Sequence, residues 1–195
     1  KMLNDGFPSV RPERRRRTPI EFFSSLLVVA LLLAGVSNQL QAAERETGIL
    51  EVQIKDHRDA IGDFDKLIIT IDKISVSPKP GMKFWQTGWK DLAVTSESVD
   101  LTQYVGKTAA QVFRAPIEAG AFDAFHLKIK STAGVLKKAR RKAPVKNTIG
   151  RFKLAYEVRP KTETLLILDL VVSDMSDHPP RGYELSLKGY ELFMN

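Results

Sequence analysis

The clearest pattern along the chain is an alternation of apolar and polar side chains after residue 46. It occurs in five segments, residues 50–55, 67–76, 125–130, 152–157 and 183–192. Successive side chains of a β-strand point to opposite faces, so a period of two indicates strands with one buried face. Residues 164–172 are apolar at most positions on both faces, which is typical of a central strand. We therefore predict a chain dominated by strands.

Turn-forming residues separate these segments. Proline and glycine interrupt the alternation at residues 77–81, 118–121, 159–161 and 178–182. No long amphipathic helix is visible after residue 46, and residues 101–111 have room for a short helical turn. Roughly eight to ten strands with turns between them favour an all-β domain, an antiparallel two-sheet sandwich, over a fold with helical crossovers.

Residues 22–36 form a run of uncharged, mostly apolar side chains. A positively charged start, an apolar run and small residues after it describe a secretory signal, cleaved near Ala42 or Ala43. Extended over residues 20–40, at about 1.5 Å per residue, the same run approaches the roughly 30 Å of a bilayer core, as a retained signal-anchor helix does. We expect the retained anchor and keep the cleaved signal as its alternative. The side chains expected in the membrane are Phe22, Phe23, Leu26, Leu27, Val28, Leu31, Leu32 and Leu33.

The residues just before the apolar run are four consecutive arginines, Arg14, Arg15, Arg16 and Arg17. Positive flanks stay on the cytoplasmic side, so they predict a cytoplasmic N-terminus and an exported remainder. We assign them to topology rather than to nucleic-acid binding, because no aromatic residues alternate with them. The expected protein is single-pass in the cell inner membrane, with a periplasmic C-terminal domain. Its expected parts are a basic segment (1–19), a transmembrane helix (20–40), a linker (41–46) and the domain (47–195).

The composition removes several classes of chemistry. The chain has 195 residues, a formal charge of +7, and the 43% hydrophobic and 27% charged content of an ordinary folded protein. It has no cysteine, which excludes a disulfide scaffold, a thiol nucleophile and thiolate-ligated metals. Its three histidines are far apart, and no nucleophile-elbow or phosphate-loop motif is present. We expect no enzymatic activity, no cofactor, no small-molecule substrate and no nucleic-acid partner.

The densest group of possible metal ligands is Asp56, His57 and Asp59, followed by Asp63 and Asp65. Their spacing lacks the closing glutamate of a calcium loop, and aspartates commonly start turns. We interpret the group as a polar connection between two strands and predict no metal site. A pair of carboxylates that meet only in space stays open as an alternative, enzymatic site, because sequence does not reveal such pairs.

Two segments have the character of interaction surfaces. Residues 137–146, here called the basic segment, contain no acidic residue and six basic ones, Lys137, Lys138, Arg140, Arg141, Lys142 and Lys146. Outside the cytoplasm we expect such a segment to attract membrane lipid headgroups or an acidic partner. The second candidate is Phe84 with Trp85, which follows a Pro-Gly turn and would anchor a partner or the bilayer interface.

Several motifs resemble one family. They occur at residues 47–56, 64–76, 88–92, 98–101 and, most specifically, 115–127, where an Ala-Pro and a Gly precede a strand. In this order they resemble the extracytoplasmic family called domain of unknown function 4382, over residues 47–193. The resemblance implies an immunoglobulin-like or transthyretin-like sandwich outside the membrane, and it implies no particular activity. The chain departs from the family at the basic segment and at Gly189, near the place of a proline in the last strand.

These features favour a non-catalytic accessory subunit. An N-terminal helix would hold a periplasmic β-sandwich at the membrane, where it would stabilise or bridge subunits of an integral membrane complex. A photosynthetic or respiratory assembly is one conceivable host, although no residue identifies it. The alternative is a secreted periplasmic or cell-surface binding or adhesion module with a cleaved signal peptide.

Overall fold

The computed structural model describes residues 46–79, 88–177 and 182–194. These residues belong to one unit, Arg45–Asn195. Within the described ranges, no helix has the length and apolar content needed to span a bilayer. The predicted anchor, the arginines before it, and Phe84 with Trp85 all lie outside the described residues.

Strands dominate the described residues, as the alternation predicted. They are β1 (Thr47–Asp56), β2 (Phe64–Pro78), β3 (Lys90–Leu92), β4 (Ser98–Asp100), β5 (Ala110–Glu118), β6 (Gly120–Leu136), β7 (Lys142–Ala143), β8 (Val145–Asn147), β9 (Phe152–Val158), β10 (Glu163–Asp174) and β11 (Tyr183–Met194). Two short 3-10 helices accompany them, η1 (Ala60–Asp63) and η3 (Leu101–Gln103). The second is the helical turn expected within residues 101–111.

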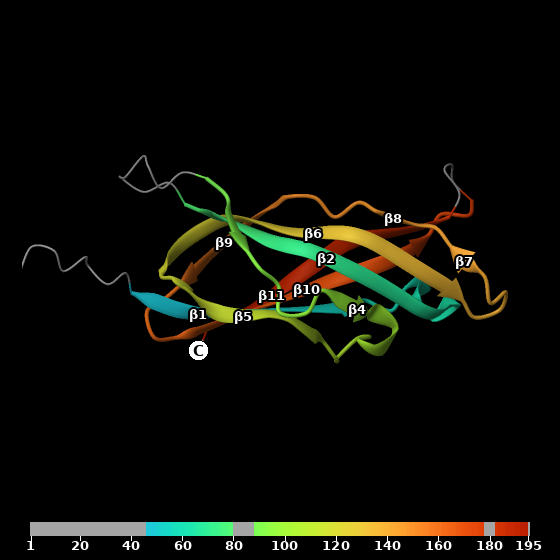
Figure 1. The fold of residues 1–195 in the computed structure, drawn as a ribbon, viewed down its shortest axis with the longest axis horizontal. Helices are drawn as coiled ribbons and strands as arrows, with labels where there is room; N and C mark the ends of the chain where they lie inside the picture. The colour runs from blue at the N-terminus through green and yellow to red at the C-terminus, as the bar shows by residue number, and fades with distance from the viewer. Residues whose placement is uncertain (1–45, 80–87, 178–181, 195) are drawn as a thin grey trace, which may run out of the picture. The chain divides into compact units, whose positions relative to one another are not determined.

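The strands form two sheets (Figure 1). Sheet A has the order β5-β1-β10-β11-β8, and sheet B has the order β3-β2-β6-β7, with β4 paired to β2 and β9 paired to β6. The prediction of an all-β fold with two sheets is confirmed. The prediction of purely antiparallel sheets is wrong, because β1 pairs with β10 in parallel from Ile49↔Glu163 to Asp56↔Leu170, and β11 pairs with β8 in parallel. Long connections, rather than tight turns, bring these strands together, so their relative direction is free.

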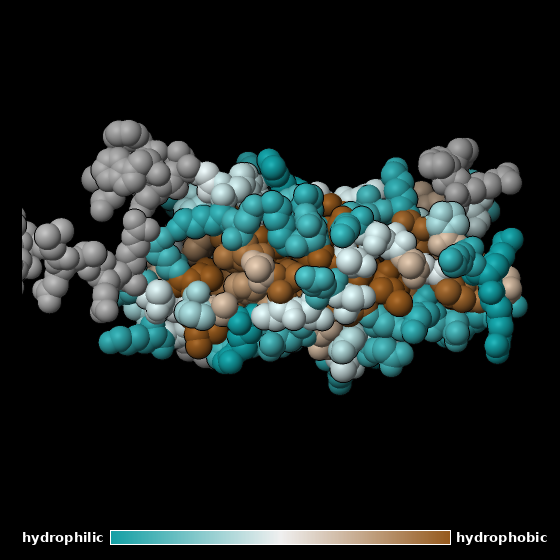
Figure 2. Space-filling model, viewed as in Figure 1, coloured by the Kyte–Doolittle hydropathy of each residue, from teal (hydrophilic) through white to brown (hydrophobic). Residues whose placement is uncertain are grey.

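A single apolar core joins the two sheets. In β1 the inward residues Leu50, Val52 and Ile54 are fully buried, and they alternate with partly exposed polar residues. Ile69 of β2 and Leu127 of β6 are equally buried and belong to the same cluster. Each such side chain contributes about 1.5–3 kcal/mol by leaving water. Figure 2 shows apolar side chains along the middle of one face, with polar side chains along its margins.

The domain has two ends that bear on function, and β6 runs between them. At the entry end, where the chain enters the domain at Thr47, the Ala119 N–H donates to the Glu46 carbonyl. At the opposite end, here called the basic end, β6 stops at Leu136 and the basic segment begins. The 17 residues of β6 correspond to about 55 Å at roughly 3.3 Å per residue. Figure 1 shows β1 beginning at one side of the view and β7 lying at the other.

Candidate functional site

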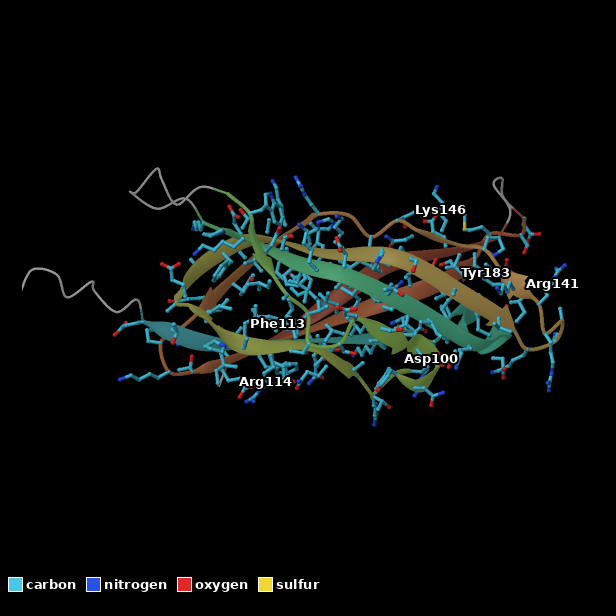
Figure 3. The ribbon with its side chains drawn as sticks, viewed as in Figure 1. Asp100, Phe113, Arg114, Arg141, Lys146 and Tyr183 are labelled. Atoms are coloured by element: carbon cyan, nitrogen blue, oxygen red, sulfur yellow. The ribbon has the colours of Figure 1, made fainter. Side chains whose placement is uncertain are left out.

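The basic segment forms an ordered turn at the end of β6. The Leu136 N–H donates to the Arg141 carbonyl at 3.0 Å, which closes the turn, and the Lys137 N–H donates to the Asp63 carbonyl at 2.8 Å. Arg140 has a φ of 45°, the left-handed conformation that lets the chain reverse here. Figure 3 shows Arg141 and Tyr183 together at this end, with Arg114 far along the domain from them. The predicted cationic surface is therefore a shaped part of the fold.

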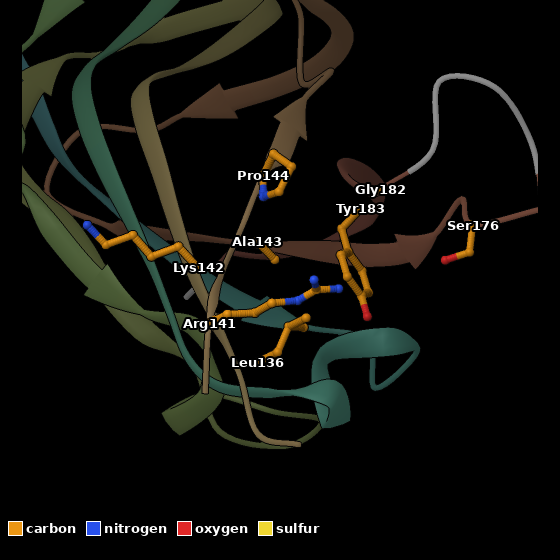
Figure 4. Close-up of a pocket in the computed structure, with 8 residues that line it drawn as sticks. All are labelled: Leu136, Arg141, Lys142, Ala143, Pro144, Ser176, Gly182 and Tyr183. Carbon is orange, nitrogen blue, oxygen red and sulfur yellow. The ribbon is translucent and has the colours of Figure 1, made fainter. Parts of the chain in front are cut away.

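A cavity of about 400 Å³ lies beside this turn. Its lining comes from the turn and from the start of β11, which are far apart in sequence: Leu136, Arg141, Lys142, Ala143, Pro144, Ser176, Gly182 and Tyr183. The close-up shows the Arg141 side chain extending toward Tyr183, whereas Lys142 extends in the opposite direction (Figure 4). The cavity therefore joins one guanidinium group, one phenol ring and an apolar wall.

Packing beneath the cavity holds Tyr183 in place. Its ring meets the buried Phe64 ring edge-on at 4.7 Å between centroids, and its hydroxyl donates to Asp63 Oδ2 at 3.1 Å. Burial first, and then the hydrogen bond to Asp63, raise the pKa of the Tyr183 hydroxyl above its ordinary value. Gly134 makes room for this arrangement, because a Cβ at that position would lie 2.5 Å from Phe64 Cε1. The cavity floor is thus rigid.

The charges of the basic segment lack counterions within the described part of the chain. No carboxylate there lies within 4.0 Å of the charged atoms of Lys137, Lys138, Arg140, Arg141, Lys142 or Lys146. Several cations on the strands, by contrast, are paired: Arg114 binds Glu163 through two hydrogen bonds of 3.0 and 3.2 Å, and Lys128 lies 2.8 Å from Asp72. The basic end therefore concentrates uncompensated positive charge.

The aspartate group that sequence singled out does not converge on one point. Asp56 is buried at the end of β1, whereas Asp59 and Asp65 are exposed. The described residues contain no group of three or more His, Asp or Glu side chains placed to hold a metal ion. His57 Nδ1 instead meets Asp169 Oδ2 at 2.8 Å. Sequence missed Asp169 as a partner because the contact depends on the parallel pairing of β1 with β10.

Asp56 is the most perturbed carboxyl in the described residues. Its Oδ1 accepts a hydrogen bond from the Arg58 N–H at 2.8 Å, while its buried Oδ2 has no partner. Burial, opposed by that hydrogen bond and assisted by the charge of Asp169, raises its pKa to about 6. Its backbone joins β1 to the 104–106 loop through bonds to Tyr104 and Gly106. The arrangement is a structural junction whose side chain is sensitive to pH.

His126 lies on the polar side of β6, as its place in the alternation predicted. It is partly buried, and its ring is 6.4 Å from that of Trp89, over which the Arg151 guanidinium stacks at 4.9 Å. Burial and the nearby charge of Arg151 lower the pKa of His126. Ser75 lies opposite His126 on β2, and its hydroxyl donates to Asp91 Oδ1 at 2.7 Å. The cluster is a surface packing arrangement of aromatic, cationic and hydrogen-bonded groups.

The entry end has a different character. The exposed large apolar residues Tyr190, Phe193 and Met194, at 47%, 46% and 54% exposure, all lie in the second half of β11. β8 pairs with β11 only from Tyr183 to Leu185, so the rest of β11 has β10 on one side and no paired strand of the described residues on the other. Sequence predicted this strand but not its position at the edge of sheet A.

The fold and the two ends define an all-β domain, with two sheets around one core and a cationic cavity at one end. Residues 47–186 match the model of the family described as Domain of unknown function (DUF4382). The chain belongs to that family, and the resemblance stated from sequence is confirmed. No curated protein and no solved structure matches the chain at a significant level.

Proposed function

We propose that this protein is a non-catalytic accessory subunit of an integral membrane complex. Its N-terminal segment holds the domain at the outer face of the inner membrane. The domain, an immunoglobulin-like or transthyretin-like sandwich in this proposal, then bridges membrane-embedded subunits and a second component farther out. This role needs two separate contact surfaces on one rigid body.

The observation that carries the proposal is the placement of those surfaces. Exposed Tyr190 and Phe193 lie on β11, and the end of β11 pairs with the start of β10. The start of β10 in turn pairs with the start of β1, at the entry end. Tyr183, which lines the cavity beside the basic segment, begins the same strand, so Tyr190 and Phe193 lie about 23 and 33 Å from it at roughly 3.3 Å per residue. Apolar contact area suits a stable neighbour, and dense charge suits attraction of a partner from solution.

The occupant proposed for the exposed part of β11 is a membrane-embedded subunit beside the anchor. Two features support it. The apolar run of residues 22–36 precedes Glu46 in the chain. The Glu46 carbonyl accepts a hydrogen bond from the Ala119 N–H at the entry end. Lys79, where the chain departs toward Phe84 and Trp85, donates its N–H to Ala121 at the same end. The described ends of both segments, Glu46 and Lys79, are thus held at the entry end of the domain.

The test is the intact mass of the protein recovered from gently solubilised native membranes, after assemblies are separated by size. The proposal predicts the full-length mass of 21.9 kDa in a fraction much larger than the monomer. A shorter mass, cut near Ala42 or Ala43 and found as a free monomer, contradicts it. That result supports the alternative, a secreted binding or adhesion module.

A further inference from the structure

We propose that the cavity beside Arg141 binds a carboxylate side chain of an acidic protein segment. This assigns a partner chemistry to the basic end. It rests on the proposed function only in that this end contacts a second component of the assembly. The ligand class follows from the donor set, the shape of the cavity and the charge around it.

The donor set is the guanidinium group of Arg141. Its side chain extends toward Tyr183 across the cavity (Figure 4). A guanidinium presents five N–H donors in a planar fork that matches a carboxylate in two parallel hydrogen bonds. Among the described residues it forms no ion pair, so the fork has no internal carboxylate to satisfy it.

The nearest internal competitors are already engaged. Asp63 accepts the hydrogen bond of the Tyr183 hydroxyl, and Asp174 accepts one from the Ser176 N–H at 2.9 Å. The negative charges of Asp63 and Asp174 raise the pKa of the Tyr183 hydroxyl, and the positive charge of Arg141 lowers it. Neither carboxylate forms an ion pair with Arg141, so an incoming carboxylate can supply that partner, while the other cations of the basic segment offset the repulsion from Asp63 and Asp174.

The cavity is larger than a single ion and only partly polar. Its volume of about 400 Å³ lies at the small end of ligand sites, which span roughly 300–1,000 Å³. Leu136, Ala143, Pro144 and the Tyr183 ring give it an apolar wall. A carboxylate on an aliphatic stem, as in glutamate, places its charge on Arg141 and its methylenes against that wall.

An acidic protein segment is favoured over lipid because of the shape of the site. The guanidinium lies in a cavity beside an apolar wall, which admits a single side chain, rather than on a flat cationic face. The five remaining cations of the basic segment attract an acidic chain over a distance of about 8–10 Å at physiological salt. They raise the local concentration of the ligand, and Arg141 supplies the specific contact.

The test uses the full-length chain in a mild non-ionic detergent and a dye-labelled oligoglutamate peptide of roughly eight residues. Binding is followed by fluorescence anisotropy. Arg141→Ala is expected to weaken binding by about tenfold or more, since hydrogen bonds to charged groups are the strong ones. Lys142→Ala, which removes the neighbouring charge that points away from Tyr183, is expected to weaken it by about threefold or less. Lys153→Ala, an exposed lysine on β9, serves as the distant control and is expected to leave binding unchanged.

Equal losses in Arg141→Ala and Lys142→Ala would overturn the proposal, because they indicate diffuse attraction without a site. Absence of peptide binding to the unaltered chain would also overturn it. Displacement of the peptide by a soluble short-chain phosphatidylglycerol at a lower concentration than by unlabelled oligoglutamate would do the same. Arg141→Lys keeps the positive charge but not the planar guanidinium fork. It is expected to retain the fold and to lose most of the peptide affinity. This variant therefore tests the proposal even if Arg141→Ala unfolds. Recovery of the unaltered chain in a large membrane assembly is a separate result, so this proposal can fail while the proposed function stands.

Discussion

The two ends of the domain are built for different tasks. The basic end is a cavity on a packed floor, where Phe64 is fully buried against Tyr183 and Gly134 leaves room for its ring. The entry end is an open strand edge with exposed Tyr190 and Phe193. A rigid cavity can select a ligand by shape and charge, whereas an open apolar edge needs a permanent neighbour to cover it. The contrast teaches that one domain can combine a fixed attachment with a selective contact.

The largest effect is expected at the floor of the basic end. Phe64→Ala removes a fully buried ring from beneath Tyr183, so we expect a loss of about 3–5 kcal/mol in the free energy of unfolding. Urea denaturation followed by tryptophan fluorescence measures it. Phe64→Leu, which keeps most of the volume, should lose about 1–2 kcal/mol. A loss below 1 kcal/mol in Phe64→Ala would contradict the claim that this end is rigidly supported.

The next effect concerns Asp56, buried where β1 reaches the basic end. The folded pKa of Asp56, about 6, lies above the ordinary aspartate pKa of 3.8. Its contribution to stability is therefore full below the lower pKa and is lost as pH rises through the higher one. We therefore expect Asp56→Asn to be about 2 kcal/mol more stable than the unaltered chain at a pH of about 7.5. At a pH of about 4 the two should be nearly equal.

Chemical denaturation across this pH range checks the prediction for Asp56. Asp65→Asn changes an exposed carboxyl on β2 and is the control. Its stability relative to the unaltered chain should stay within about 0.5 kcal/mol at both pH values. A constant difference between Asp56→Asn and the unaltered chain from acid to neutral pH would show that Asp56 is not the pH-sensitive group.

At the entry end, the backbone contact at Gly48 is expected to matter about as much as a small core change. A Cβ there would lie 2.1 Å from the Arg159 carbonyl oxygen, so Gly48→Ala forces β1 and the 159–162 turn apart. We expect a loss of about 1–3 kcal/mol by thermal or urea unfolding. Gly150→Ala, at a position with no heavy atom within 4 Å of the added Cβ, is the matched control and should change stability little. Equal losses in the two variants would contradict the close contact.

The smallest effect on stability is expected from the exposed residues of β11. Tyr190→Ser combined with Phe193→Ser should lower the free energy of unfolding by only about 1 kcal/mol. Both rings are about half exposed, although Tyr190 stacks on Phe152 at 6.5 Å between ring centroids. The same change should release the protein from its large membrane assembly, as measured by size separation after gentle solubilisation. Lys188→Ser on the same strand is the control. If the double variant still separates with the large membrane assembly, the exposed part of β11 does not have the proposed role.

The sequence was informative where burial alternates locally. The alternation of Leu50, Val52 and Ile54 predicted β1 and its inward face, and the structure bears this out because the pleat of a strand fixes side-chain direction. It predicted two sheets, but it could not predict the parallel pairing of β1 with β10. Nothing local to either strand encodes that direction, which depends on how the long connection crosses the domain.

The candidate site shows the same division. The charge of residues 137–146 is visible in the sequence, and their exposure follows from it. The cavity is not, because Arg141 and Tyr183 meet only through the pairing of β8 with β11. The exposed edge at Tyr190 also depends on how far β8 extends along β11, a property of the assembled sheet rather than of the strand's own residues.

The central claim is that the two ends contact different partners at the same time. Its most direct test is photo-cross-linking in native membranes, with a photoreactive phenylalanine analogue placed at Phe193 in one experiment and at Lys138 in another. The account predicts that position 193 captures a membrane-embedded protein and that position 138 captures a different protein with an acidic segment. Capture of the same partner from both positions, or of none by a chain found only as a free monomer, would contradict it.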